Sequence, residues 1–402
     1  MSRSLRDTYW LTGGFRPFFF LGALSMALSV LAWIPILSGH LELPTAFIPR
    51  DWHIHTMLFG GVSAIIAGFA LTAVANWTGR PPVAGGELFA LVLLWLAGRI
   101  AVTVSALTGA WAAMAVDLAF PLALVAVFAR EVIAGGNLRN LRVVVIVALY
   151  GLANAAFHAE AALTGFADHA ARAGIAVVLL LVMLIGGRII PAFTRNWLMQ
   201  RRALSLPAGF SRLDGGAILI SAAALAMWIA VPGHLATALL MLAAGLANGL
   251  RLSRWCGLAT RSDPLLLVLH LGFATVPLGF VLEGLSILLP GVLEPSAAAH
   301  VWTAGTFGMM TLAVMTRASR GHSGHPLAAG RLEVAIYALV ALGAAARVLA
   351  PYAGNLAGNG GGNWVVHLFA CAALLWALAY LLFAAGYARM LLWRPGLPVR
   401  RP

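Results

Sequence analysis

The stretch Trp52-His53-Ile54-His55-Thr56-Met57-Leu58-Phe59-Gly60 begins an apolar segment that continues to about Val74. A run of this length can cross the hydrocarbon core of a bilayer as one helix. The two histidines at its start are unusual there, because imidazole is a poor guest in hydrocarbon and a good ligand for iron and copper. The segment therefore indicates a membrane fold, and its histidines are either part of a metal centre or residues that pack between helices.

The rest of the chain has the same character. Of its 402 residues, 61% are hydrophobic and only 10% are charged, whereas about 25% are charged in a typical soluble domain. The connections between apolar runs are short, so we predict an all-α integral membrane protein with one polytopic domain over residues 1–402. The expected spans are 17–38, 53–75, 87–107, 112–130, 142–164, 171–190, 214–231, 234–250, 264–288, 297–316, 332–350 and 364–386.

The net charge of +13 comes from arginine alone. With the N-terminus inside, most arginines fall on the cytoplasmic side, and the outer side holds little beyond Arg50, Arg172 and Arg347. This asymmetry follows the positive-inside rule. It predicts an even number of spans with both termini in the cytoplasm, and it explains the basic charge without a nucleic-acid partner.

This topology sorts the histidines by depth. His53, His55, His158 and His300, on three different spans, fall near the outer face, while His270 lies toward the inner end of its span. His322 and His325 follow the span 297–316 on the inner side. Because residues two apart on a helix point about 200° away from each other, His53 and His55 cannot easily bind one ion together. They could serve two neighbouring centres.

Ordinary roles remain open for each histidine. His53, His55 and His300 could be interfacial residues at helix starts, and His158 could form an interhelical hydrogen bond. His270 could pair with Glu283 or a backbone carbonyl, and His322 could be solvated in its loop.

Charged residues inside the spans are few, and those that need an explanation are Arg99, Asp117, Glu160 and Glu283. Each costs about 2.5–3.5 kcal/mol at the bilayer centre, so each needs a partner or a wet cavity. Arg99 and Asp117 could form an ion pair across adjacent helices. Alternatively, Arg99 could neutralise a haem propionate, and Glu160 could carry protons to a metal centre.

Several longer motifs resemble the NnrS family of bacterial inner-membrane proteins. They are Gly14-Phe15-Arg16-Pro17-Phe18-Phe19, Trp52-His53-Ile54-His55 with Met57-Leu58-Phe59-Gly60, Ala67-Gly68-Phe69, Asn76-Trp77-Thr78-Gly79-Arg80, Gly187-Arg188-Ile189-Ile190-Pro191-Ala192-Phe193-Thr194-Arg195-Asn196-Trp197, and Met310-Thr311-Leu312-Ala313-Val314-Met315-Thr316-Arg317-Ala318-Ser319-Arg320-Gly321-His322-Ser323-Gly324. The resemblance covers about residues 14–327.

The resemblance implies b-type haem, copper and a role in denitrification or resistance to nitric oxide. On this hypothesis His53, His55, His158 and His300, with His322, would bind metal. His270 would bind a haem, Arg99 would balance its propionates and Glu160 would pass protons. One departure is Thr56, where the family usually has glutamate; this residue could still cap the helix.

The span ends Asn76-Trp77, Thr194-Arg195-Asn196-Trp197 and Thr316-Arg317 recur about every four helices. Three groups of four helices are also the layout of haem-copper oxidases, which is an analogy at the level of architecture. The interpretations of function are a redox protein that binds and removes or reduces nitric oxide, a transporter of copper, haem or a metal-nitrosyl species, and a sensor or assembly factor. The electron donor is not indicated by the sequence.

Overall fold

The computed structural model describes residue 5 and residues 8–353 and 361–394. Within these residues the chain is helical and has no β-strand. Besides the short 3-10 turns η2 (Tyr9–Leu11) and η8 (Ala350–Tyr352), the elements in chain order are α1 (Phe15–Leu37), α2 (Pro49–His55), η3 (Thr56–Val62), α3 (Ser63–Thr78), α4 (Gly85–Thr103), α5 (Ser105–Thr108), α6 (Ala110–Ala134), η4 (Leu138–Asn140), α7 (Leu141–Thr164), α8 (Asp168–Leu181), η5 (Val182–Gly186), α9 (Gly187–Gln200), α10 (Arg212–Ala230), α11 (Leu235–Ser253), η6 (Gly257–Thr260), α12 (Pro264–Leu288), α13 (Pro295–His300), η7 (Val301–Thr306), α14 (Phe307–His322), α15 (Arg331–Leu349) and α17 (Gly361–Leu392).

Eleven helices in the described residues are long and apolar enough to cross a membrane. They correspond to eleven of the twelve expected spans, and Pro264–Leu288 has the predicted bounds. The remaining expected span, 297–316, is also helical, from α13 through η7 to α14. The protein is therefore an all-helical, multi-pass membrane protein.

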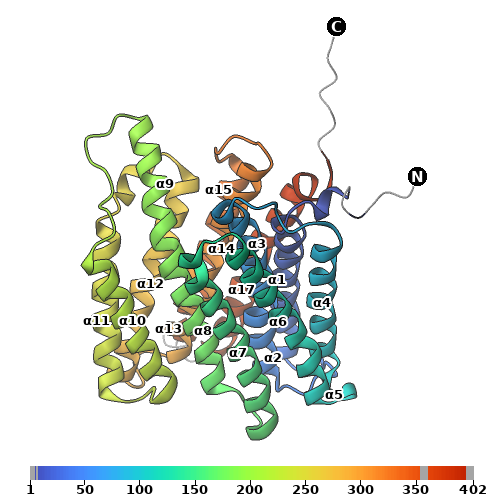
Figure 1. The fold of residues 1–402 in the computed structure, drawn as a ribbon. Coiled ribbons are helices and arrows are strands. Elements are labelled where there is room, and N and C mark those ends of the chain that lie inside the picture. The colour runs from blue at the N-terminus through green and yellow to red at the C-terminus, as the bar shows by residue number, and fades with distance from the viewer. Residues whose placement is uncertain (1–4, 6–7, 354–360, 395–402) are drawn as a thin grey trace.

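The start of α1 and the end of α17 lie on the same face of the helical bundle (Figure 1). The Tyr9 hydroxyl lies 3.4 Å from the Met390 carbonyl oxygen, and the Arg16 guanidinium donates to the same oxygen at 2.8 Å. Because the start of the first span lies beside the end of the last span, the chain crosses the membrane an even number of times. The segment Pro295–His322 thus counts as a twelfth crossing. The cytoplasmic location of this face stays a prediction.

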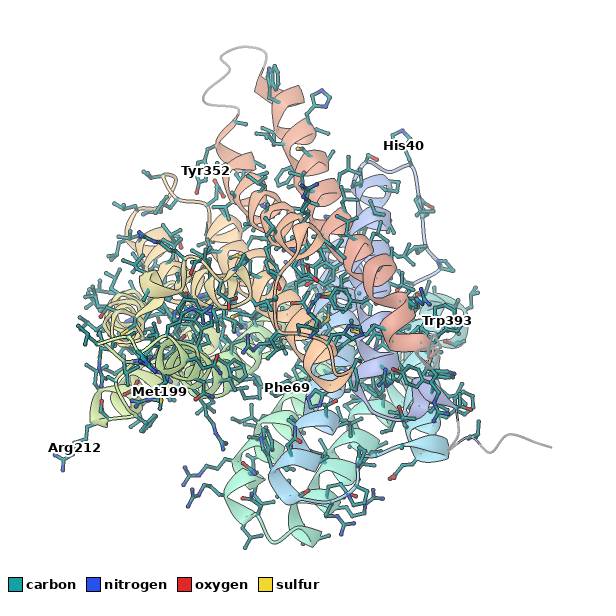
Figure 2. The ribbon with its side chains drawn as sticks, turned by 90° about the horizontal axis from the view of Figure 1, so that it is seen from above. His40, Phe69, Met199, Arg212, Tyr352 and Trp393 are labelled. Atoms are coloured by element: carbon teal, nitrogen blue, oxygen red, sulfur yellow. The ribbon has the colours of Figure 1, made fainter. Side chains whose placement is uncertain are left out.

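The helices close into a ring. Each span packs against the next one along the chain, and α17 packs against α1. In the view from above, the blue-to-cyan, green-to-yellow and orange-to-red parts of the chain occupy three sectors, and Phe69 lies where they meet (Figure 2).

Three spans contain a π-helical turn: η3 in the second span, η5 in the sixth and η7 in the tenth. These turns begin at residues 56, 182 and 301, so they recur about every four helices, as the sequence motifs do. All three spans contribute side chains to one apolar cavity of about 100 Å³ at the centre of the bundle. The turns η3 and η7 directly follow His55 and His300. Short π-helical turns occur frequently at functional sites.

Candidate metal centre

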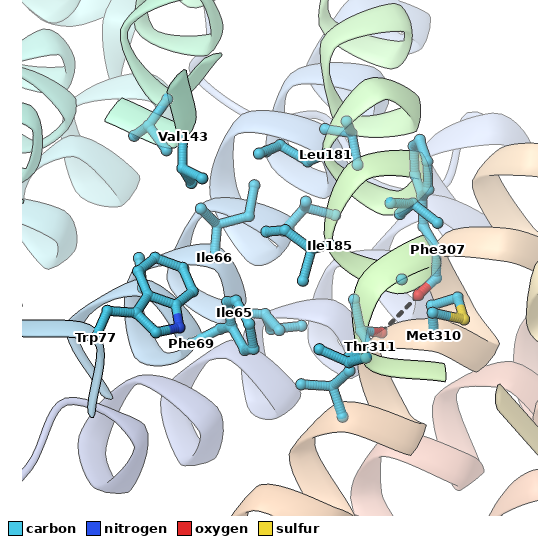
Figure 3. Close-up of a pocket in the computed structure, with 18 residues that line it drawn as sticks. Ile65, Ile66, Phe69, Trp77, Val143, Leu181, Ile185, Phe307, Met310 and Thr311 are labelled. Carbon is cyan, nitrogen blue, oxygen red and sulfur yellow. Dashed lines mark hydrogen bonds between the residues drawn. The ribbon is translucent and has the colours of Figure 1, made fainter. Parts of the chain in front are cut away.

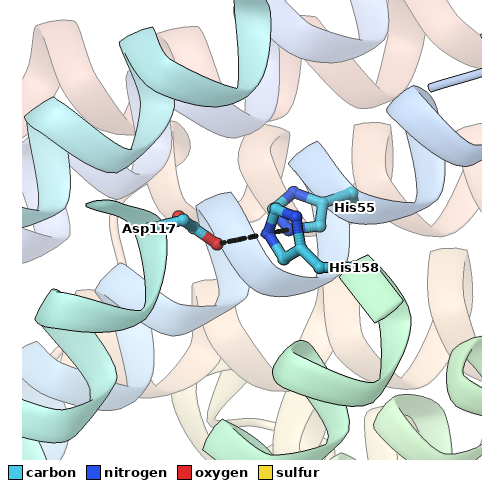
Figure 4. Close-up of side chains that lie close together, drawn as sticks. All are labelled: His55, Asp117 and His158. Atoms are coloured by element: carbon cyan, nitrogen blue, oxygen red, sulfur yellow. Dashed lines mark hydrogen bonds and ion pairs between the residues drawn. The ribbon is translucent and has the colours of Figure 1, made fainter. Parts of the chain in front are cut away.

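Two histidines and one aspartate from three helices converge in a buried cluster (Figure 4). The Nε2 atoms of His55 and His158 lie 3.1 Å apart. Oδ2 of Asp117 lies 3.1 Å from Nε2 of His158 and 3.3 Å from Nε2 of His55. The three side chains come from α2, α7 and α6, and each residue is at most 4% exposed. Within the described residues, this is the group of three or more potential metal ligands that the fold assembles.

The start of the second span is fixed before His55 is reached. Pro49 occupies the first turn of α2, where its missing N–H costs nothing. Asp51 is fully buried, and its Oδ2 accepts a hydrogen bond from the backbone N–H of Ala167 at 2.8 Å. Arg50 bridges Asp51 and Asp168. These contacts connect α2 with the start of α8 and set the position of His55.

The π-helical turn η3, which follows His55 in the chain, also helps to hold this residue in place. Its changed hydrogen-bond pattern leaves backbone carbonyls free for side-chain donors. The Gly60 carbonyl accepts from Trp95 Nε1 at 3.0 Å and from the Ser63 hydroxyl at 2.7 Å, and the Leu58 carbonyl accepts from the Tyr150 hydroxyl. Three neighbouring elements thus hold the backbone that follows the histidine.

Asp117 also forms an ion pair with Arg99 of α4 through its other oxygen, Oδ1. This confirms the pair suggested by the sequence. Arg99 packs on Gly60, where an added Cβ would come within 2.6 Å of Nη1. The pair places a balanced charge in an apolar region, where an unpaired carboxylate would be costly.

Without a metal ion, no placement of the protons on His55 and His158 makes every polar contact in the cluster a hydrogen bond. Asn154 donates from Nδ2 to Asp117 Oδ2 at 2.8 Å, and its Oδ1 lies 2.9 Å from Nε2 of His55. If both Nε2 atoms carry hydrogen, two donors face each other at 3.1 Å. If one is bare, its lone pair faces the oxygen of Asp117. A neutral histidine has one donor and one acceptor nitrogen, so no tautomer gives every contact a hydrogen bond.

A metal ion bound between these three side chains would remove this conflict. The two nitrogens and Asp117 Oδ2 form a triangle with sides of 3.1, 3.1 and 3.3 Å. Around a tetrahedral ion with bonds of about 2.0 Å, neighbouring ligand atoms lie about 3.3 Å apart. Two imidazoles and a carboxylate suit a divalent transition metal such as copper, iron or zinc. The three side chains therefore fit such an ion with little rearrangement.

Aromatic rings enclose the cluster. The Phe47 ring stacks on His55 with a centroid distance of 5.2 Å, and the rings of Phe59 and Phe157 both lie 5.5 Å from the same imidazole. His55 is fully buried. The surroundings are thus apolar, which strengthens electrostatic interactions inside the cluster.

The comparison with known protein families gives one match. The sequence model of one family, described as NnrS protein, matches residues 9–395. The chain belongs to the NnrS family. No curated protein matches the chain at a significant level. Membership of the NnrS family fits a membrane protein tied to the response to nitric oxide.

The other outer histidines do not join this cluster. His53 points to another side of α2, as its spacing from His55 predicts, and stacks on Trp33 with a centroid distance of 4.6 Å. Its Nδ1 is buried and has no hydrogen-bond partner. His300 donates from Nδ1 to the Ser296 carbonyl oxygen at 2.6 Å.

His270 and His322 are not part of the cluster and have other contacts. Nε2 of His270 lies 2.8 Å from the Thr194 hydroxyl, so the partner is neither Glu283 nor a backbone carbonyl. Glu283 instead accepts from Trp228 Nε1 at 2.7 Å. His322 is exposed at the end of α14, and its ring lies 5.6 Å from Phe15.

Glu160 has a capping role. Its carboxylate accepts backbone hydrogen bonds from Asp168, His169 and Ala170 at the start of α8. Because Glu160 follows His158 by two residues, it projects to a different side of α7. Thr56 lies within the continuous helix, and its buried hydroxyl has no partner, so the expected cap is absent.

Sequence reasoning missed two members of the cluster. Asp117 was assigned to Arg99 alone, and Asn154 was given no role. A signal for Asn154 was present, because it precedes His158 by one helical turn and so lies on the same face. The spacing within α7 could have predicted a polar pair on that face.

Proposed function

We propose that this protein binds nitric oxide at a transition-metal centre held by His55, His158 and Asp117, and that it removes or reduces nitric oxide in the bacterial inner membrane. This role would belong to nitrosative stress resistance or denitrification. Support comes from family membership and from one observation above all: three buried ligand atoms converge at distances of 3.1–3.3 Å.

Each side chain of the centre would have a separate role. His55 and His158 would donate nitrogen lone pairs, Asp117 would supply the negative charge, and Arg99 would balance it through Oδ1. Phe47, Phe59 and Phe157 would exclude water. A bound copper or iron ion would supply the coordination site and redox chemistry for nitric oxide. Nitric oxide is apolar enough to enter from the lipid, so the site needs no polar channel.

The resemblance implies copper, and the donor set fits it. The same set of two histidines and one carboxylate is also typical of non-haem iron. Metal analysis of the purified protein distinguishes the two. For the expected b-type haem, His322 is a residue with suitable surroundings, since it lines a large cavity with arginines.

The test begins with protein purified from membranes without added metal. We expect about one copper or iron ion per chain in the wild type, and a change in its paramagnetic resonance spectrum when nitric oxide is added. His55→Ala, His158→Ala and Asp117→Asn should each lose the ion. His40→Ala is the control, because His40 lies in an exposed turn. A correctly assembled wild type without metal, or a triple variant with unchanged metal, would refute the proposal.

The sequence Gly186-Gly187 with Pro191 could break the sixth span, and Pro277 could break the ninth, but neither position supports the transporter alternative. The helix α12 continues through Pro277, and the sixth span passes through the π-helical turn η5 without unwinding. Transporters typically have discontinuous helices at their substrate sites. Uptake of copper into vesicles containing this protein would nevertheless favour transport over metal retention.

A further inference from the structure

A second site lies at the end of the bundle where the chain begins and ends. A cavity of about 1120 Å³ extends between spans from all three sectors. The cavity includes His322, which contacts Phe15 at the start of α1. Six of the residues that line it are arginines, and none is acidic. They are Arg139, Arg142, Arg188, Arg195, Arg251 and Arg317.

The positive charge of this cavity is largely uncompensated. Among the described residues, only Arg251 of the six arginines forms an ion pair, with Asp214 at 3.1 Å. Arg317 lies over the Phe193 ring at 4.2 Å, and Arg195 donates to the Pro207 carbonyl. A concave surface lined by charges of one sign concentrates ligands of the opposite sign. The cavity therefore favours an anion with several acid groups.

The guanidinium of Arg251 is held in place and has one nitrogen that can still donate a hydrogen bond. It is only 1% exposed, and its Nη1 has no hydrogen-bond partner. Gly187 permits its position, since an added Cβ would come within 1.8 Å of Nη2. A buried guanidinium N–H without an acceptor is costly. A carboxylate or phosphate oxygen is the acceptor that guanidinium binds best.

The inner wall of the cavity is apolar. It is shared with the central cavity of about 100 Å³ between the three spans that contain π-helical turns (Figure 3). The central cavity exposes almost no polar atoms. The residues that line both cavities are Phe69, Trp77, Val143, Ile185, Ile189 and Val314. A ligand in this place would meet arginines at one end and hydrocarbon side chains at the other.

We propose that this cavity binds an amphipathic molecule with at least two acid groups. Its acid groups contact Arg251, Arg317 and neighbouring arginines, and its apolar part lies against the wall shared with the central cavity. Two sources offer this chemistry: a porphyrin with two propionates, such as haem, and an anionic phospholipid. The inference does not depend on the metal centre at His55.

The test compares Arg188→Gln/Arg317→Gln with Arg212→Gln. The two altered arginines line the cavity and have no ion pair among the described residues. Arg212 is the matched control, because it points away from the molecule (Figure 2). Each purified protein is measured for haem by its optical spectrum and for bound phospholipid by mass spectrometry. Haemin and cardiolipin are then titrated separately, with thermal unfolding as a second measurement.

We expect the double variant to bind one of the two probes at least about tenfold more weakly, since losing one charged hydrogen bond typically weakens binding by about that factor. Its unfolding temperature without ligand should match that of Arg212→Gln. Selective loss of haem assigns a porphyrin, and selective loss of phospholipid assigns a lipid. Equal binding of both probes by the double variant and the control would overturn the proposal, as would absence of binding by the wild type.

Gly187→Ala provides a variant that keeps every arginine. The added Cβ should displace Arg251 and weaken binding of the same probe. Metal content at the His55 cluster, measured in the same samples, should be unchanged in all these variants. Wild-type protein that binds the probe but contains no metal would count against the proposed function and leave the cavity proposal standing.

Discussion

Gly98 on α4 packs directly against Asp117 on α6. A Cβ at Gly98 would lie 2.5 Å from Oδ1 of Asp117 and 3.1 Å from its Cα. The second distance involves backbone, which cannot move without shifting a helix. The absence of a side chain at Gly98 thus lets α4 and α6 approach closely, and this approach brings Arg99 to Asp117.

Gly98→Ala should therefore separate the two helices and disturb the cluster. We expect a loss of about 1–3 kcal/mol in the free energy of unfolding, as for other overpacked sites, and a lower metal content. Gly151→Ala is the control, because its nearest contact would be an ordinary 3.4 Å from Pro121. Thermal unfolding and metal analysis check both variants, and equal behaviour would contradict the close-packing argument.

Arg99→Leu should leave the Asp117 carboxylate buried without its cation. Removing one partner of a buried ion pair typically costs about 3–5 kcal/mol. A divalent ion at the cluster would compensate part of this charge, so the loss of stability should be larger after chelation than in metal-loaded protein. The comparison needs thermal unfolding of each variant with and without chelator.

The double variant Arg99→Leu/Asp117→Leu is the matched test of this reasoning. It removes both charges and should be more stable than Arg99→Leu alone in the absence of metal. A double variant that is less stable than Arg99→Leu in the absence of metal would show that the unpaired Asp117 carboxylate is not the source of the effect.

Tyr150→Phe should weaken the support of the π-helical turn η3. It leaves the buried Leu58 carbonyl without its donor, which typically costs about 1–3 kcal/mol. We expect a lower unfolding temperature and weaker metal binding at His55. Tyr352→Phe is the control, because the Tyr352 hydroxyl only accepts from the exposed Glu294 N–H. Unchanged metal affinity in Tyr150→Phe would show that the π-helical turn η3 does not position the metal ligands.

The twelfth crossing can be tested by labelling single cysteines. Val292 and Leu327 flank the segment Pro295–His322 and are exposed. In a background with Cys256→Ser and Cys371→Ser, Val292→Cys and Leu327→Cys should react with an impermeant thiol reagent from opposite sides of the membrane. Trp393→Cys should react from the same side as Leu327→Cys. Labelling of Val292→Cys and Leu327→Cys from one side would leave eleven crossings.

The length and apolar composition of the runs were sufficient to predict the spans, because insertion into lipid depends mainly on these two properties. The span 264–288 was placed correctly to the residue at both ends. The π-helical turns could not be predicted, because they depend on partners such as Trp95 and Tyr150 from other helices. No local pattern in residues 56–62 identifies those partners.

The sequence predicted the depth of the site residues in the membrane better than the side of each helix from which they project. His55 and His158 were expected at one depth, and the fold brings them together. Glu160 was expected near them at a similar depth but projects to another side of α7 and caps α8. The sequence predicts the pairing of Asp117 with Arg99 but not the contacts of its second oxygen with His55, His158 and Asn154. A carboxylate has room for several partners, and the sequence does not show how many helices surround it.

The contact between α17 and α1 closes the ring and has a topological consequence. Because Met390 lies beside Tyr9 and Arg16, the fold does not require the chain to start where it does. The two ends could be joined by a peptide linker and new ends opened in another loop of the same face, such as residues 201–211. Every helix would keep its neighbours in such a circular permutant, so the order of insertion would change while the assembled ring stayed the same.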